Sequence, residues 1–123
     1  MLCAHCHCGA VQVEIPAAPD SATQCNCSIC HRLGALWAFY PASAVRFTGH
    51  PEHTDSYSWG RHQRQFVRCR TCGCTTHCQR TLPGQETEIE VNVRLFDPQA
   101  LGPFRLRHFD GAETWQYIEP GAP

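Results

Sequence analysis

The chain lacks long hydrophobic runs and has almost no net charge. No apolar stretch approaches the roughly 18 residues that a membrane-spanning helix needs, so we expect no membrane insertion. A formal net charge of −1 gives no electrostatic basis for binding nucleic acid or an anionic membrane surface. Repeats, linkers and low-complexity segments are also missing. Hydrophobic residues make up 42% of the chain and charged residues only 17%, which indicates a globular protein rather than a disordered one.

The N-terminal sequence has no features of a secretory signal. Residues 1–6 contain neither a basic region nor an apolar one, so we expect a cytoplasmic protein. The length predicts one domain over residues 1–123, and the nine glycines and nine prolines indicate many turns. A core of this size is small. Bound metal would add to its stability, because the binding energy of a structural metal site is also folding energy.

Cysteine, by contrast, is abundant, with ten in the chain. Seven cysteines form three tight groups, namely Cys6 and Cys8, then Cys25, Cys27 and Cys30, then Cys69 and Cys72. Such spacings gather sulfur atoms around a point, whereas a disulfide framework spreads them so as to join distant loops. Together with the expected reducing compartment, the spacings favour metal binding over disulfides.

The seven cysteines divide naturally into four and three. Each outer pair ends in Cys-Gly, where glycine lets the backbone turn tightly toward the thiolates. Joining the outer pairs would close one tetrahedral structural zinc site, and the middle group would hold a second zinc with a free position, as in a catalytic site. The alternative is two closed sites, in which another side chain completes the second. The candidates for that eighth ligand are Cys74, Cys78, His31 and His77.

Three thiolates around Zn²⁺ would leave the middle site with a net charge of −1, which makes it a weak Lewis acid toward water. Such a site suits a soft thiolate as its fourth ligand, because the thiolate stays nucleophilic while its pKa is lowered. We therefore expect capture of a small thiol and its addition to a carbonyl carbon, or the reverse. If Cys30 begins a helix, the helix dipole would also stabilise its thiolate. His31 follows directly and is a candidate acid or base.

Hydrophobic alternation predicts a mainly β fold with little helix. The expected strands are residues 11–15, 36–40, 45–47, 55–59, 65–68, 75–81, 88–93 and 104–109. Helical turns are expected at residues 28–33, ended by Gly34, and after Asp97, which would cap a turn that starts at Pro98. We expect the tail from Pro120 to fray.

A different zinc pattern is present superficially. His50-Pro51-Glu52, followed later by Cys69 and Cys72, matches the H-x-E…P-C-x-x-C signature of zinc deaminases. However, Arg68 instead of proline precedes Cys69, and residues 49–51 favour a turn over the start of a helix. The match also leaves the other two cysteine groups unexplained, so we disfavour it.

The ordered cysteine motifs resemble those of the glutathione-dependent formaldehyde-activating enzyme family, which also includes the centromere protein V domain. The matching segments are Cys-His-Cys-Gly-Ala-Val at 6–11, Cys-Asn-Cys-Ser-Ile-Cys-His-Arg at 25–32 and Cys-x-x-Cys-Gly at 69–73. Residues 107–115, Arg-His-Phe-Asp-Gly-Ala-Glu-Thr-Trp, are similar to the C-terminal signature of the family. The resemblance covers nearly the whole chain.

The resemblance implies a β-tent fold, in which two antiparallel sheets face each other and are stapled by zinc knuckles. It implies structural zinc on Cys6, Cys8, Cys69 and Cys72. It implies catalytic zinc on Cys25, Cys27 and Cys30. The implied activity is that of a carbon–sulfur lyase, which joins glutathione and formaldehyde as S-hydroxymethylglutathione.

We therefore expect an enzyme with two zinc ions per chain and with a small thiol and a small aldehyde as substrates. Candidates to bind the carboxylates of a thiol such as glutathione are Arg32, Arg61 and Arg64. Candidate pocket walls are Trp37, Phe39, Trp59 and Trp115. Two other functions stay open. One is a non-catalytic binding module that recognises a ligand through its surface, and the other is a metal or redox handler whose middle cysteines load and release zinc.

Overall fold

The computed structural model describes residues 1–84 and 86–118. The described strands are β1 (Leu2–His5), β2 (Gln12–Ile15), β3 (Ser21–Cys25), β4 (Trp37–Pro41), β5 (Arg46–Thr48), β6 (Thr54–Tyr57), β7 (Arg64–Cys69), β8 (Thr75–Arg80), β9 (Glu88–Asn92), β10 (Arg105–Asp110) and β11 (Gln116–Ile118). The helical elements are α1 (Ser28–Leu33), α2 (Pro98–Leu101) and the 3-10 turns η1 (Ala42–Ala44) and η2 (Val93–Leu95). The prediction of a mainly β fold with little helix is confirmed. The predicted fraying from Pro120 lies outside the described residues.

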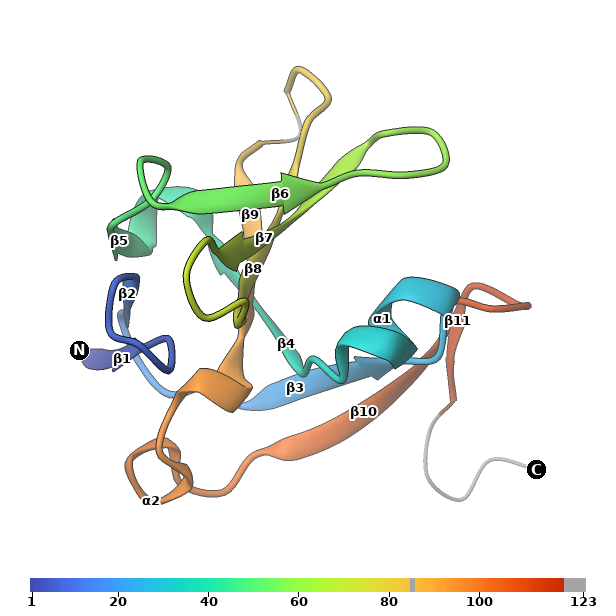
Figure 1. Cartoon of the computed structure of the whole chain (residues 1–123). Helices are drawn as coiled ribbons and strands as arrows, with labels where there is room; N and C mark the ends of the chain where they lie inside the picture. Colours follow the sequence, from blue (N-terminus) through green and yellow to red (C-terminus); the bar gives the residue numbers. More distant parts are fainter. Residues whose placement is uncertain (85, 119–123) are drawn as a thin grey trace.

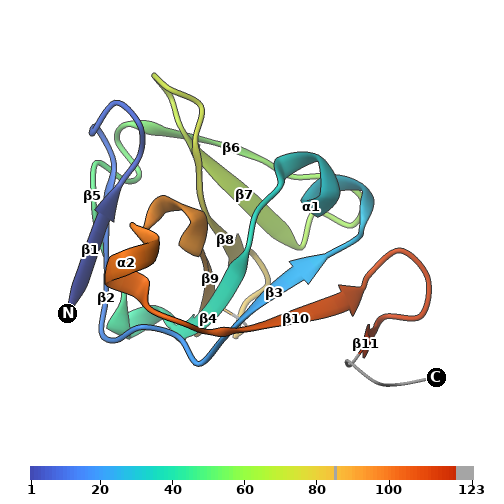
Figure 2. The ribbon, with the colours of Figure 1, turned by 90° about the horizontal axis from the view of Figure 1, so that it is seen from below.

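The strands form two sheets, which confirms the two-sheet architecture that the resemblance implies. The smaller sheet has the order β1-β2-β5, and the larger one runs β11-β10-β3-β4-β9-β8-β7-β6 (Figure 1). All described ladders are antiparallel except β3–β10, which is parallel and sets Phe109 beside Cys25. A parallel pair needs a long crossover, and β3 and β10 are separated by most of the chain. In Figure 2, α1 follows the end of β3, on the same side of the molecule as the loop after β10.

The helix α1 begins and ends where the sequence predicts, and α2 begins at the predicted residue. The Cys27 sulfur caps α1 by accepting a hydrogen bond from the Cys30 amide, and Gly34 ends the helix in a left-handed conformation with φ of 67°. Asp97 caps α2 by accepting from the Gln99 amide at 2.9 Å. None of the helices in the described residues has the length and hydropathy of a membrane span.

Three strands, β1, β3 and β11, are not predicted by the hydrophobic pattern. β3 has no clear alternation, because the small neighbours Ala22 and Thr23 are both buried. β1 and β11 are short and mostly exposed, so neither carries a strong apolar signal. β3 also pairs with the distant strand β10, and a local pattern does not record that pairing.

The main core lies between the smaller sheet and the centre of the larger one. Its members include Val13 and Ile15 of β2, Ala38 of β4, and Ile89 and Val91 of β9. The opposite face of β9 carries its polar residues. Alternation predicts that this face meets solvent, yet Glu90 is only 5% exposed. That face forms part of a cavity, described below.

Candidate metal centres

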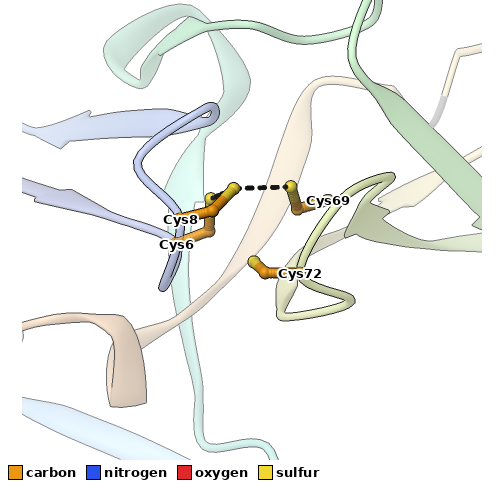
Figure 3. Close-up of side chains that lie close together, drawn as sticks. All are labelled: Cys6, Cys8, Cys69 and Cys72. Carbon is orange, nitrogen blue, oxygen red and sulfur yellow. Dashed lines mark hydrogen bonds between the residues drawn. The ribbon is translucent and has the colours of Figure 1, made fainter.

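Four of the cysteines meet where a turn of the smaller sheet faces a turn of the larger one. Cys6 and Cys8 come from the β1–β2 loop, Cys69 is the last residue of β7, and Cys72 lies in the turn that follows it (Figure 3). We call these residues the four-cysteine cluster. Their sulfur atoms all lie within 4.8 Å of one another, with 3.7 Å between Cys6 and Cys8 and 3.5 Å between Cys8 and Cys69. A tetrahedral zinc with bonds of about 2.3 Å separates its sulfurs by about 3.8 Å. The cluster therefore fits a closed metal site.

Local turns orient these sulfurs. Gly9 and Gly73 have φ of 84° and 77°, values that favour glycine, and their amides bond back to the carbonyls of Cys6 and Cys69. The Val11 amide also donates to the Cys6 sulfur at 3.3 Å. Cys6 and Cys69 are fully buried, so two of the sulfurs are shielded from water.

The remaining predicted group, Cys25, Cys27 and Cys30, also converges, and we call it the three-cysteine cluster. Cys25 ends β3, Cys27 caps α1, and Cys30 lies in the first turn of that helix. Their sulfur atoms lie within 4.8 Å of one another. Among the described residues, no further Cys, His, Asp or Glu ligand atom lies within that distance of all three sulfurs. This excludes the eighth ligands considered from the sequence, namely Cys74, Cys78, His31 and His77, in this arrangement.

Within the three-cysteine cluster, the surroundings favour the anionic form of one sulfur, that of Cys25. A hydrogen bond with Cys30 lowers the pKa of Cys25 to about 5. The same hydrogen bond, together with burial, raises the pKa of Cys30. The Cys30 amide donates to the Cys27 sulfur at 3.4 Å, and the Trp37 indole Nε1 donates to the Cys30 sulfur at 3.3 Å. Thiolate is the form of cysteine that binds metals, so this environment suits a metal ion.

The loop after β10 packs directly on this cluster. A Cβ atom on Gly111 would lie 2.7 Å from the Cys25 sulfur and 3.2 Å from the Cys27 Cβ. Because such a contact is too short, only glycine allows the loop to approach this closely. The Gly111 amide also donates a hydrogen bond to Cys25.

Asp110 and Asn26 hold that loop in place. The Asp110 carboxylate accepts hydrogen bonds from Asn26 Nδ2 at 2.9 Å and from the amide and hydroxyl of Thr114 at 3.1 and 2.8 Å. These bonds lower the pKa of Asp110. Asn26 Oδ1 in turn accepts from the Ala112 amide at 3.0 Å. The segment 107–115, which the sequence marks only by resemblance, thus braces the cysteine loop.

A cavity of about 720 Å³ opens beside the three-cysteine cluster, and all three cysteines line it. The four predicted wall residues, Trp37, Phe39, Trp59 and Trp115, line it too. Other aromatic walls, which the sequence does not single out, are Phe66, Phe109 and Tyr117. Trp115 is 63% exposed and its backbone has φ of 60°, an unusual conformation for a bulky residue.

Of the three predicted arginines, Arg61 and Arg64 line the cavity, whereas Arg32 does not. The Arg32 guanidinium is exposed and donates to the Ser28 carbonyl of its own helix at 2.8 Å. His31 also lies elsewhere, in a second hollow of about 360 Å³ that touches Cys25 and Cys30 from another side. These two positions give no support to a role for Arg32 or His31 in the larger cavity.

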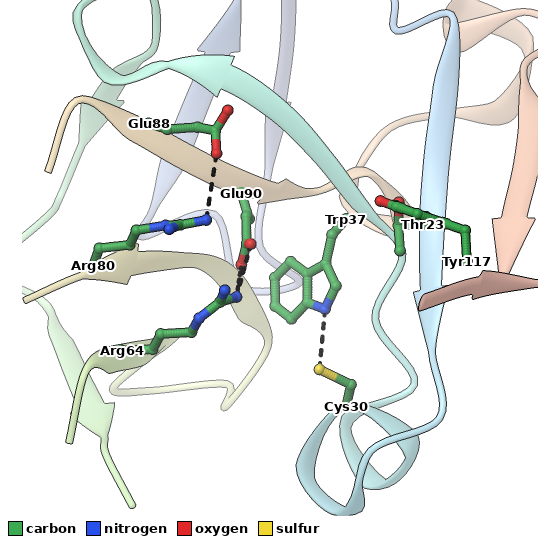
Figure 4. A network of polar contacts seen from close by, with 8 residues as sticks. All are labelled: Thr23, Cys30, Trp37, Arg64, Arg80, Glu88, Glu90 and Tyr117. Atoms are coloured by element: carbon green, nitrogen blue, oxygen red, sulfur yellow. Dashed lines mark hydrogen bonds and ion pairs between the residues drawn. The ribbon is translucent and has the colours of Figure 1, made fainter. Parts of the chain in front are cut away.

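The charged part of the cavity comes from β7, β8 and β9, and the sequence reveals only part of it. Arg64 Nη1 contacts the two carboxylate oxygens of Glu90 at 2.8 and 3.2 Å (Figure 4). Burial alone would lower the pKa of Arg64, but Glu90 raises it. Arg80 pairs with Glu88 at 3.5 Å. In the described part of the chain, no ion pair involves Arg61.

The deaminase pattern does not assemble. Cys69 and Cys72 group with Cys6 and Cys8, and no described histidine joins them. His50 instead contacts Phe47 and His77, with ring centroids 5.3 and 4.5 Å away.

The chain is similar to one family of proteins and to a solved structure. The sequence profile of the glutathione-dependent formaldehyde-activating enzyme family matches residues 1–108. A crystal structure of a protein from Rhodobacter sphaeroides is 34% identical, with a TM-score of 0.68, and the match covers 85% of this chain and 99% of that one. The family match spans both cysteine clusters, with all seven cysteines in the matched region. The chain belongs to the glutathione-dependent formaldehyde-activating enzyme family.

Proposed function

We propose that this protein is a zinc-dependent carbon–sulfur lyase that joins a small anionic thiol, such as glutathione, to formaldehyde or a related small aldehyde, or catalyses the reverse. The observation that carries the proposal is the three-cysteine cluster, which borders a large cavity and has no fourth ligand among the described side chains. Family membership supports the same chemistry. A closed cluster or one remote from any cavity would not support it.

We assign structural zinc to the four-cysteine cluster and catalytic zinc to the three-cysteine cluster. Zinc at the second position would stabilise the thiol substrate as a thiolate and so keep it nucleophilic at neutral pH. The three cysteines would hold the metal, and Gly111 and Trp37 donate hydrogen bonds to the sulfurs of Cys25 and Cys30. The aromatic walls would give the substrates an apolar surface to pack against.

The reaction balances without an oxidant or a reductant. The thiol loses its proton, and a bond forms between its sulfur and the carbonyl carbon. The carbon–oxygen double bond becomes a single bond, and a proton is delivered to that oxygen, which becomes the hydroxyl of the S-hydroxymethyl product. The reverse reaction breaks the carbon–sulfur bond and returns the proton to sulfur.

The cavity has room and charge for the thiol partner. Its volume falls in the range of about 300–1,000 Å³ that is typical of sites for drug-sized ligands, far more than formaldehyde requires. Arg61, which makes no ion pair within the described residues, is our candidate for a substrate carboxylate. Arg64 is already balanced by Glu90 and so contributes less net charge.

The proposal is tested by NMR exchange spectroscopy with ¹³C-formaldehyde and glutathione, with and without the zinc-loaded protein. We expect the protein to accelerate exchange between formaldehyde and its adduct beyond the fast spontaneous reaction. Cys27→Ser should abolish the acceleration, and Cys3→Ser, which removes an exposed thiol outside both clusters, should keep it. Exchange equal to that in buffer would end the enzyme proposal for these substrates. If glutathione still bound, the non-catalytic binding module would be favoured instead.

A further inference from the structure

We propose that Trp37 is a positioning residue of the three-cysteine cluster. By donating its indole N–H to Cys30, it withdraws charge from that sulfur and strengthens the hold of the cluster on its metal. This inference rests on the metal site of the proposed function, but it is independent of which substrates that site takes. Nothing in the cysteine spacing indicates it, because Trp37 belongs to a different element.

Trp37 is held firmly in the position that the bond requires. It is the first residue of β4, pairs with Thr23 on one side and Asn92 on the other, and is only 3% exposed. Its ring lies 6.2 Å from that of Phe66, measured between centroids. Figure 4 shows the indole nitrogen directed at the Cys30 sulfur, at a distance of 3.3 Å. The donor is therefore fixed by the sheet and not by the cysteine loop.

The three sulfurs differ in where their hydrogen bonds come from. Cys25 accepts from the Gly111 amide in the loop after β10, and Cys27 accepts from the Cys30 amide in the first turn of α1. Trp37 is the side-chain N–H donor to this cluster among the described residues. In the four-cysteine cluster, the N–H donor to Cys6 is the backbone amide of Val11. A rigid side-chain donor thus distinguishes the cluster that borders the cavity.

The physical consequence follows from charge. Three thiolates and a divalent ion carry a net charge of −1, so each sulfur is electron-rich and competes with the next ligand for the metal. A hydrogen bond to a charged, buried acceptor is stronger than one to a neutral acceptor. Outer partners of this kind typically change metal affinity by about 10- to 100-fold. Without Trp37, Cys30 would keep its sulfur near the metal but lose this compensation.

A purely structural role for Trp37 is the competing explanation. A buried indole N–H needs some acceptor, and Cys30 could serve merely to satisfy it. The two explanations differ in their predicted effect on the electronic environment of the bound metal. A structural indole would affect packing around the cavity, whereas a positioning indole would change the electronic environment of one metal and leave the other unchanged.

The test is ¹¹³Cd NMR of the cadmium-loaded chain, with no thiol or aldehyde added. We expect two cadmium resonances in the wild type and a scalar coupling between one of them and the Trp37 indole proton. Trp37→Phe, which keeps a ring but removes the donor, should shift that resonance alone. Zinc competition with a chelator should show about a tenfold or greater loss of affinity at the same site. Phe66→Leu alters the packing against the same ring and should leave both resonances near their wild-type positions.

Each outcome has a distinct meaning. A wild-type spectrum without a second resonance would overturn both this inference and the proposed metal site. Two resonances with no indole coupling, or no selective shift in Trp37→Phe, would overturn this inference and leave the proposed function standing. An equal shift in Phe66→Leu would assign Trp37 a packing role only. The four-cysteine resonance reports whether each variant is folded, and the wild-type coupling requires no variant.

Discussion

The two cysteine clusters use the same donor atoms but differ in how the chain supplies them. The four-cysteine cluster joins residues from two sheets, and its Cys8 and Cys69 sulfurs, 3.5 Å apart, are separated by 61 positions in the sequence. The three-cysteine cluster comes from the single stretch 25–30. Two cysteines of the four-cysteine cluster are fully buried, whereas the three-cysteine cluster borders a cavity of about 720 Å³.

This difference predicts that metal at one cluster stabilises the fold, while metal at the other can be lost or replaced without unfolding. Ligands that are distant in sequence close a long loop, so metal there stabilises the fold as a whole. Ligands within one short stretch close only a small loop, and the contents of their site can change while the sheets stay paired. Under the proposed function, metal at the four-cysteine cluster would join the two sheets, and the three-cysteine cluster would carry the chemistry without unfolding the protein.

Removing a ligand of the four-cysteine cluster should have the largest effect on the free energy of unfolding. Structural zinc sites contribute on the order of 10 kcal/mol to folding, and Cys69→Ser should remove a large part of that. Cys27→Ser should lower the free energy of unfolding by only about 1–2 kcal/mol, since its ligand set is local. Urea unfolding followed by circular dichroism measures both variants. Equal losses in the two would contradict the division of roles, as would unfolding when a mild chelator removes the first metal equivalent.

The second prediction concerns the contact that shapes the three-cysteine cluster. Gly111→Ala places a methyl group 2.7 Å from the Cys25 sulfur, so the loop after β10 must move. We expect about 1–3 kcal/mol of destabilisation and about a 10- to 100-fold loss of metal affinity at this cluster alone. Ala112→Ser, at an exposed neighbour, is the matched control. Isothermal titration with zinc would refute the idea if Gly111→Ala bound both equivalents as the wild type does.

The sequence predicts the clusters well because metal ligands are recognised by local spacing. The helices α1 and α2 are equally local, since their caps lie beside them. What surrounds the clusters is not local. The alternation of β9 predicts that Glu90 faces solvent. Glu90 is instead buried and lines a cavity whose other walls come from several elements. The bond between Asn26 and Asp110 spans 84 positions, and nothing near either residue signals it.

The third prediction tests what the cavity adds to the three-cysteine cluster. Arg61→Ala should raise the KM for glutathione about tenfold with little change in kcat, because a charge-assisted hydrogen bond to a substrate carboxylate is lost. Arg32→Ala should change neither constant, since Arg32 does not line the cavity. 2-Mercaptoethanol, which has no carboxylate, should be insensitive to both substitutions. A similar KM change for both thiols would instead indicate a role of Arg61 in shaping the cavity.

The smallest predicted effect concerns a buried histidine where β8 of the larger sheet meets β5 of the smaller one. His77 of β8 is fully buried against Phe47 of β5 and His50, with ring centroids 4.2 and 4.5 Å away. Burial, followed by the charge of His50, lowers the pKa of His77 from 6.5 to about 3. Because the folded state resists protonation, the stabilising contribution is complete above pH 6.5 and is lost as the pH falls below it. Between pH 7 and 5.5 we expect a loss of about 1 kcal/mol.

Metal binding by cysteine is itself pH-dependent, so the histidine contribution must be isolated by substitution. His77→Gln cannot titrate, and its free energy of unfolding should therefore fall by about 1 kcal/mol less than that of the wild type between pH 7 and 5.5. His108→Gln removes an exposed histidine and should keep the wild-type slope. If the free energy of unfolding fell equally in all three proteins, the acid sensitivity would come from the cysteines and not from His77.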